Sequence, residues 1–225
     1  MTDQGHDHHQ GLDHGHARDR GLRGFVHYLL LLPKMWRGAA SDHVIDTIAP
    51  GRGTDLVDIG AGMGPATVAA ARRGAQVTAV DPMPYMRRIL SLRRLVQRNR
   101  QAITVVAGTA EQLPIADATA DVVVGVNTMH HWQDLDAAAA EIHRVLRPGG
   151  RIMLVDEDFD DPDHGRNRAD GGRRHRRHRH RMTPVGAEEM ADALSKAGLV
   201  ATDAVTTSAA PGVPIKQATA RKADV

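Results

Sequence analysis

The stretch Asp58-Ile59-Gly60-Ala61-Gly62-Met63-Gly64 decides the fold. It follows a short apolar strand predicted over 55–59 and precedes a helix predicted over 65–73, with Pro65 in its first turn, where a missing N–H costs little. Glycines allow positive φ and leave no Cβ between the backbone and a ligand, and a helix N-terminus favours an anionic group. The stretch therefore predicts a ligand-binding turn, with a turn that serves only strand–helix packing as the alternative.

The spacing of the glycines separates several nucleotide-binding motifs. A dinucleotide fingerprint would need its third glycine one position later, where Pro65 stands, and a P-loop would need Gly-Lys-Ser/Thr. Asp81, at the end of the next predicted strand, should face the same crevice, where its carboxylate can accept hydrogen bonds from both hydroxyls of a ribose. These residues favour an adenosine-like ligand without a pyrophosphate.

Around this motif, strands and helices alternate regularly. Short apolar strands separated by helices predict an α/β fold with a parallel sheet covered on both faces, wound as a doubly wound sandwich. The strands are expected over 55–59, 76–80, 103–107, 121–126 and 151–155, with helices over 65–73, 84–98 and 135–146. A helix over 184–197 and two weaker strands, over 200–207 and 213–220, follow a charged segment.

The same pattern predicts the organisation of the chain. One domain is expected, with a core that binds the ligand preceded by an apolar helical lid and interrupted late by a charged loop. The predicted divisions are a disordered His-rich tail at 1–20, the lid segment at 21–50, the binding core at 51–157, a disordered Arg/His-rich loop at 158–182 and a completing helix and hairpin at 183–225.

Composition excludes several classes of chemistry. The sequence has no cysteine, which rules out disulfides, thiolate zinc sites and a cysteine nucleophile. The N-terminus is polar and rich in histidine rather than apolar, so no secretory signal is predicted. The longest apolar stretch, 25–32, is too short to span a bilayer, and a cytoplasmic location without a membrane span is expected.

Several ordered motifs together resemble the class I methyltransferases, in particular the ubiquinone/menaquinone-biosynthesis-like group with a type 11 methyltransferase domain. The resemblance covers about residues 22–154 well and the C-terminal third loosely. It is carried by the stretches 57–64 (VDIGAGMG), 80–86 (VDPMPYM), 108–114 (GTAEQLP), 121–124 (DVVV) and 144–151 (RVLRPGGR).

The resemblance implies a seven-stranded, mainly parallel Rossmann-like sheet with an antiparallel last strand, and S-adenosyl-L-methionine as the cofactor. It further implies that the glycine loop holds the methionine end of the cofactor, the second strand its ribose, and the loops after strands two to four its adenine and remaining surface. The implied binding residues are Asp58, Gly60 and Gly62 for the methionine end, Asp81 for the ribose, and Pro82, Thr109 and Ala110 for the adenine, with Gly64 and Asn127 as further cofactor-binding residues.

The expected activity is methyl transfer to a small organic acceptor by in-line displacement, in which the protein mainly aligns the nucleophile. The acceptor should face the segment 127–134, just beyond the fourth strand. His130 or His131 could act as a base for an acceptor that carries a proton. The alternative is that both histidines shape the loop before the next helix. No resident metal site is predicted.

Two other functions stay open at this point. The run 173–181 (RRHRRHRHR) could dock a nucleic acid or an acidic protein for methylation, although no aromatic residues interleave with it and nucleic-acid binding is disfavoured. A non-catalytic metal-binding or regulatory protein on the same fold is the second. Weak divalent-metal binding by the tail would use His6, His8, His9, His14 and His16, and a flexible polar tail is the simpler interpretation.

Overall fold

The computed structural model describes residues 38–165, 167 and 184–224. The His-rich tail, most of the expected lid segment and the Arg/His run lie outside the described residues. The chain divides into the unit Met1–Pro33 and the unit Lys34–Val225, and the second unit contains every element described below.

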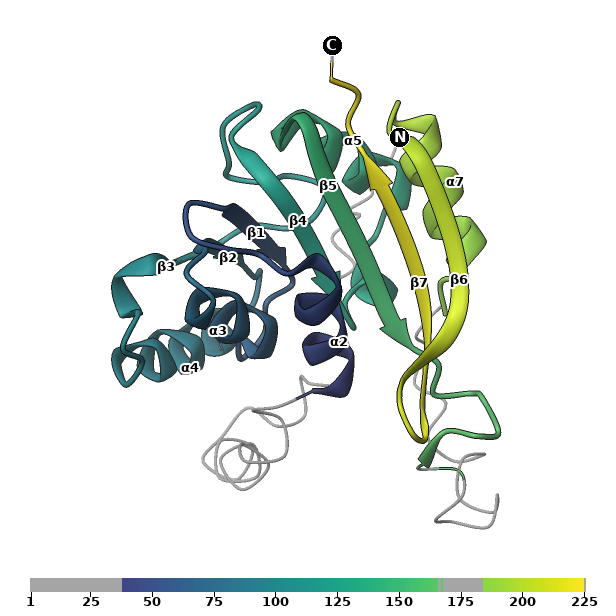
Figure 1. The fold of residues 1–225 in the computed structure, drawn as a ribbon, viewed down its shortest axis with the longest axis horizontal. Helices are drawn as coiled ribbons and strands as arrows, with labels where there is room; N and C mark the ends of the chain where they lie inside the picture. Colours follow the sequence, from purple (N-terminus) through teal and green to yellow (C-terminus); the bar gives the residue numbers. More distant parts are fainter. Residues whose placement is uncertain (1–37, 166, 168–183, 225) are drawn as a thin grey trace, which may run out of the picture. The chain divides into compact units, whose positions relative to one another are not determined.

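The second unit is built on one seven-stranded sheet with the order β3-β2-β1-β4-β5-β7-β6. Its first five strands in chain order are parallel, and β7 runs antiparallel to both β5 and β6, so that the arrowheads of β5 and β7 point in opposite directions in Figure 1. The strands are β1 (Asp55–Ile59), β2 (Gln76–Val80), β3 (Ile103–Val106), β4 (Ala120–Val126), β5 (Leu146–Glu157), β6 (Val200–Ala210) and β7 (Val213–Arg221).

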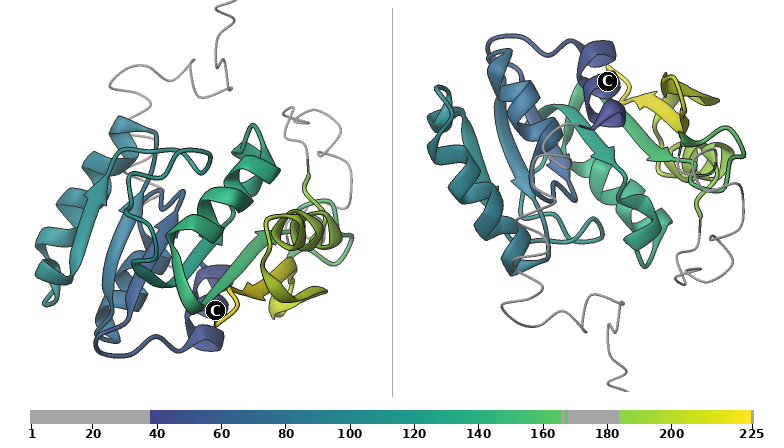
Figure 2. Two further views of the ribbon diagram at one scale, coloured as in Figure 1. Left: turned by 90° about the horizontal axis from the view of Figure 1, so that it is seen from above. Right: turned by 90° about the horizontal axis from the view of Figure 1, so that it is seen from below.

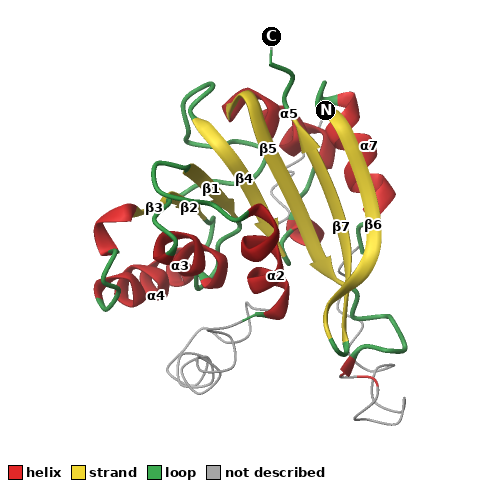
Figure 3. Cartoon of the chain, viewed as in Figure 1, coloured by secondary structure: helices red, strands yellow, loops and turns green. Residues whose placement is uncertain are grey.

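Helices cover both faces of this sheet, as Figure 3 shows by secondary structure. Figure 2 shows α2 and α5 on opposite sides of β4 and β5. The α-helices are α2 (Ala39–Ile48), α3 (Pro65–Arg72), α4 (Pro84–Leu95), α5 (Leu135–Val145) and α7 (Ala187–Lys196), with short 3₁₀ turns η2 (Arg100–Ala102) and η3 (Met129–His131). The α/β fold with an antiparallel last strand is therefore confirmed.

The central strands are apolar on both faces because each face carries its own core. Along β4, Val123 packs with α5 and α7, while Val122 and Val124 pack with α2 and α3. Successive side chains of a strand point to opposite faces, so a strand buried on both sides needs an unbroken apolar run. This requirement explains why the expected strands were short runs of valine, isoleucine and leucine.

Several boundaries differ from the prediction: α7 begins at Ala187 instead of 184, β6 ends at Ala210 instead of 207, and the largest difference is at β5. The fifth strand was expected over 151–155, but β5 begins at Leu146 and continues to Glu157. Leu146 pairs with Ala120, and the pairing then shifts register before Arg151 joins Val122. The Pro-Gly-Gly segment at 148–150 is thus an irregularity within β5. The sequence had indicated a turn that ends before the strand begins. The helix α4 ends at Leu95, earlier than the expected residue 98.

The order of the strands sets the location of the site. The chain leaves β1 toward β2 on one side, and β4 lies on the other side of β1. In an open parallel sheet a ligand crevice forms at such a switch point, outside the carboxyl ends of the strands. The loops after the five parallel strands β1 to β5 are therefore the ones that can build a site.

Candidate active site at the carboxyl ends of the central strands

The glycine loop after β1 is a tight turn against β2 and β4. Gly60 has φ +67°, and its N–H donates to the carbonyl of Val80 at 2.8 Å. A Cβ on Gly60 would lie 1.9 Å from Oγ1 of Thr128, and one on Gly64 would lie 2.3 Å from Cδ1 of Leu90. Close packing thus explains two of the three glycines. At Gly62 the nearest atom to an added Cβ is 3.9 Å away, so only its φ of +53° requires glycine.

Asp81 joins the glycine loop to the start of α4. Its Oδ2 accepts the N–H of Gly62 at 2.8 Å, and its Oδ1 accepts the N–H of Met83 at 2.8 Å. Each carboxylate oxygen has about two acceptor positions, so each keeps one for a ligand. The residue is 5% exposed, and burial raises the pKa of its carboxyl, although the hydrogen bonds from Met83 and Gly62 oppose that shift.

Asp58, at the end of β1, is a second buried acid in this crevice. Oγ1 of Thr67 donates to its Oδ2 at 2.5 Å, which ties β1 to the first turns of α3. Burial raises the pKa of Asp58 to about 7, against the hydrogen bonds from Thr67, and the negative charge of Asp81 contributes in the same direction. The site is thus rich in buried carboxyl groups, which favours a cationic group on the ligand.

The loop after β4 is fixed to the end of β5 by Asn127. Nδ2 of Asn127 donates to Oε1 of Glu157 at 2.9 Å, and the N–H of Glu157 donates to Oδ1 of Asn127 at 2.7 Å. The backbone of Asn127 has φ +55°, a left-handed conformation that asparagine tolerates better than most residues. Both functions of its side-chain amide are therefore engaged in joining the two strands.

His130 and His131, which are equivalent candidates for a base from the sequence alone, have different surroundings in the structure. Nδ1 of His130 lies 3.1 Å from Oδ2 of Asp156, and the side chains are 11% and 8% exposed. His131 is exposed, and its ring centroid lies 4.1 Å from that of His130. His130 thus pairs with a buried carboxylate at the end of β5, and sequence reasoning did not foresee this pairing.

The loop at 108–117 carries the residues predicted for the adenine side. Ala110 is buried, whereas Thr109 and Pro82 are exposed. A Cβ on Gly108 would lie 2.5 Å from Cδ of Pro114, so this loop turns back closely on itself beside β2. Thr109 and Pro82 therefore follow neighbouring parallel strands, at the edge where the glycine loop also lies.

Arg144 on α5 braces this loop from below, a role the sequence did not reveal. Its guanidinium donates to the carbonyl oxygens of Leu113 and Ile115 at 3.1 and 2.8 Å and to both carboxylate oxygens of Glu141 at 2.7 Å. Glu141 in turn accepts the N–H of Leu113 at 2.8 Å. The loop is thus held by a helix that lies far from it in sequence.

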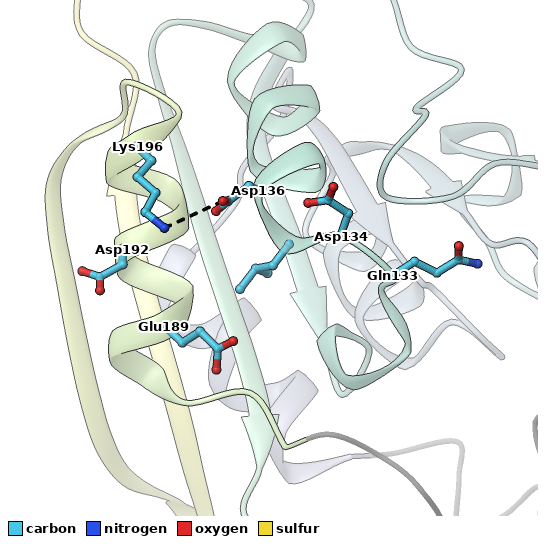
Figure 4. A pocket seen from close by; sticks show the side chains of 7 residues that line it. Gln133, Asp134, Asp136, Glu189, Asp192 and Lys196 are labelled. Atoms are coloured by element: carbon cyan, nitrogen blue, oxygen red, sulfur yellow. Dashed lines mark ion pairs between the residues drawn. The ribbon is translucent and has the colours of Figure 1, made fainter.

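A separate hollow lies between α5 and α7. Figure 4 shows its polar lining, in which the ion pair of Lys196 and Asp136 spans 3.7 Å. Its volume is about 490 Å³, and its lining includes no residue of the glycine loop.

Within the described ranges, no group of three or more acidic or histidine side chains is arranged to hold a metal ion. No described helix is long and apolar enough to cross a membrane.

Residues 57–154 match the family model described as a methyltransferase domain. The chain contains a class I S-adenosylmethionine-dependent methyltransferase domain. The motifs that carried the resemblance in the sequence lie within or beside this region, and S-adenosylmethionine is the cofactor of the family.

Relatives of this methyltransferase domain agree with the assignment. It is similar to an uncharacterized methyltransferase of Mycobacterium tuberculosis, with 40% identity over 111 residues, 49% of this chain and 43% of that protein. It is also similar to the demethylmenaquinone methyltransferase of Thermobifida fusca, with 39% identity over 101 residues, 45% and 42% of the two chains. The match thus spans less than half the length of these relatives.

Solved structures share the fold of the methyltransferase domain. A protein of Methanococcus maripaludis aligns with a TM-score of 0.67 at 18% identity, covering 100% of this chain and 98% of that one. The geranyl diphosphate C-methyltransferase of Streptomyces coelicolor, solved with S-adenosyl-L-homocysteine, aligns with a TM-score of 0.63 at 16% identity, covering 83% and 77%. At these identities the likeness concerns the fold.

Proposed function

We propose that this chain transfers the methyl group of S-adenosylmethionine to a small organic acceptor by in-line displacement. The observation that carries the proposal is the carboxylate of Asp81, which is held by the N–H groups of Gly62 and Met83 and retains an acceptor position on each oxygen. A ribose presents two neighbouring hydroxyl donors, and this carboxylate lies where the crevice of the sheet is expected.

The remaining cofactor contacts follow from the same placement. Asp58 suits the α-ammonium of the methionine end, because it is a buried acid beside the glycine loop. Gly60, Gly62 and Gly64 bring the backbone within reach of that end. For the adenine we propose Pro82 at one face and Thr109 and Ala110 at the edge, with Asn127 lining the pocket through the part of its surface that Glu157 does not cover.

The chemistry asks little of the protein beyond alignment. The sulfonium of the donor supplies the leaving group, and holding the nucleophile in line can contribute roughly 7–11 kcal/mol in the best cases. A small acceptor is supported by a relative that is named for such an acceptor, the demethylmenaquinone methyltransferase of Thermobifida fusca. The Arg/His run that could favour a polymeric acceptor lies outside the described residues.

Calorimetric titration with S-adenosylmethionine tests the proposal. Wild type should bind, and Asp81→Ala should bind at least about tenfold more weakly, because hydrogen bonds to a charged group contribute roughly 1.5–3 kcal/mol. Asp121→Ala is the matched control, since the Asp121 carboxylate also accepts a backbone N–H, from Asp55 at 2.8 Å, but at the opposite end of the strands.

Two results would contradict the proposal. Absence of binding by wild type would refute S-adenosylmethionine as the cofactor, and with it the proposed activity. Equal affinity of wild type and Asp81→Ala would refute the proposed contact between Asp81 and the ribose. Circular dichroism of each variant shows whether a loss of affinity reflects a loss of the fold.

A further inference from the structure

We propose that Asp156 is a positioning residue that holds His130 as the proton acceptor in methyl transfer, with Nε2 as its basic atom. The proposal rests on the proposed function and names the class of acceptor that suits it. That acceptor reacts at a hydroxyl, an amine or an acidic C–H, and so has a proton to lose.

The pair itself fixes which nitrogen of His130 is basic. Oδ2 of Asp156 lies 3.1 Å from Nδ1 of His130, and an ionised carboxylate can only accept a hydrogen bond. Nδ1 therefore carries the proton of the neutral ring, and Nε2 keeps its lone pair. A carboxylate in this position also stabilises the imidazolium that forms once Nε2 has taken a proton.

The other oxygen of Asp156 distinguishes this carboxylate from a purely structural one. Oδ1 is buried and, among the described residues, has no hydrogen-bond partner. Buried polar atoms are nearly always hydrogen-bonded, and an exception calls for an explanation such as a catalytic role. Among the described residues, His130 is therefore the one hydrogen-bond partner of the Asp156 carboxylate.

The loop that carries His130 lies directly against the glycine loop. A Cβ on Gly60 would come within 1.9 Å of Oγ1 of Thr128, two residues before His130. Met129 between them is 1% exposed and belongs to the core between the sheet and α5. His130 is therefore held on a short, packed turn beside the proposed methionine end of the cofactor, where the methyl group is presented.

Two neighbouring sets of hydrogen bonds join the loop after β4 to the end of β5 and hold His130 in place. Asn127 bonds reciprocally to Glu157, and His130 pairs with the adjacent Asp156. A catalytic group needs its orientation fixed by such supporting contacts. His164 also approaches a carboxylate, with Nε2 3.4 Å from Oε2 of Glu157, but it is 5% exposed, and its ring centroid lies 5.1 Å from that of Phe159.

The proposed step balances in atoms and electrons. The proton of the acceptor passes to Nε2 of His130 while the acceptor atom forms a bond to the methyl carbon. The bond between that carbon and sulfur breaks, its electron pair stays on sulfur, and S-adenosylhomocysteine leaves. The imidazolium of His130 then returns its proton to solvent.

Long-range ¹⁵N–¹H correlation spectra of the imidazole nitrogens test the positioning role. They are recorded on labelled protein about two pH units above the usual histidine pKa. The signals of His130 are those that disappear in His130→Gln. Wild type should show the Nδ1–H tautomer for this ring, and Asp156→Ala, which leaves no acceptor beside Nδ1, should lose it. Asp158→Asn is the matched control, because Asp158 pairs with Lys216 at 3.1 Å and should leave the tautomer unchanged. An unchanged tautomer in Asp156→Ala would overturn the proposal.

The proton-acceptor role has its own readout, which is formation of S-adenosylhomocysteine with two probe acceptors. Transfer to hydroquinone should fall about 100-fold or more in His130→Gln, whereas transfer to thiophenolate, which has no proton to lose, should change little. An equal loss with both probes would overturn the role.

Affinity for S-adenosylmethionine, measured by calorimetry, should stay within about twofold in Asp156→Ala and His130→Gln, which corresponds to less than about 0.5 kcal/mol. Absence of cofactor binding in wild type would refute the proposed function instead, while the tautomer spectra would still report on the pair.

Discussion

Replacing Gly60 by alanine should destabilise the protein through two separable effects. An L-residue at φ +67° costs roughly 1–2 kcal/mol relative to glycine. The new Cβ would also lie 1.9 Å from Oγ1 and 2.6 Å from Cβ of Thr128, an overlap that forces the loops after β1 and β4 apart. Such overpacking costs about 1–3 kcal/mol, so the expected total is about 2–5 kcal/mol.

Gly53→Ala is the matched control, because Gly53 also has a positive φ, +82°, but an added Cβ there meets nothing within 4 Å. It should lose only the backbone contribution of about 1–2 kcal/mol. The assay is urea unfolding followed by circular dichroism, with the free energy of unfolding extrapolated to water. Calorimetry on the same samples should show weaker cofactor binding for Gly60→Ala alone.

A double variant tests the contact itself. The three atoms nearest the added Cβ all belong to the side chain of Thr128, so Thr128→Gly should recover part of the loss caused by Gly60→Ala. Residues in contact typically show interaction energies of about 0.5–3 kcal/mol in such a cycle. If Gly60→Ala proves no more destabilising than Gly53→Ala, or if the two changes at 60 and 128 are simply additive, the described packing of the loops is refuted.

Two further predictions concern buried charge and loop bracing. Because the pKa of Asp58 is raised to about 7, the folded state binds one proton more than the unfolded state between about pH 4 and 7. The free energy of unfolding should therefore fall by about 4 kcal/mol as pH rises through that window. Asp58→Asn should flatten this dependence in urea titrations, and an unchanged slope would contradict the raised pKa. If the cofactor's ammonium lies beside Asp58, binding near pH 6 should release protons, which calorimetry in buffers of different ionisation enthalpy detects. Arg144→Lys should speed amide hydrogen exchange across 109–117, because one ammonium cannot reach Leu113, Ile115 and Glu141 together. The control is Arg147→Lys, at the start of β5, which should leave that exchange unchanged. Equal effects of the two variants would contradict the role of Arg144 in holding the loop.

Much of the fold was predictable because the signals for it are local. Runs of β-branched and aliphatic residues mark the strands, glycine and proline mark the turns, and the spacing of Gly60, Gly62 and Gly64 distinguishes the loop from other nucleotide-binding turns. The early start of β5 at Leu146 was missed, because the Pro-Gly-Gly turn indicates a break, whereas pairing with Ala120 is a property of the neighbouring strand.

The sequence by itself determined the order of the elements, the glycine loop and the position of Asp81 at the end of the second strand. Each of these depends on residues that are close together along the chain. Only the tertiary structure decided that Thr128 closes over Gly60, that Arg144 holds the loop at 109–117, and that His130 rather than His131 meets Asp156. These contacts depend on which strands are neighbours and on their register, and register is a product of packing across the whole sheet.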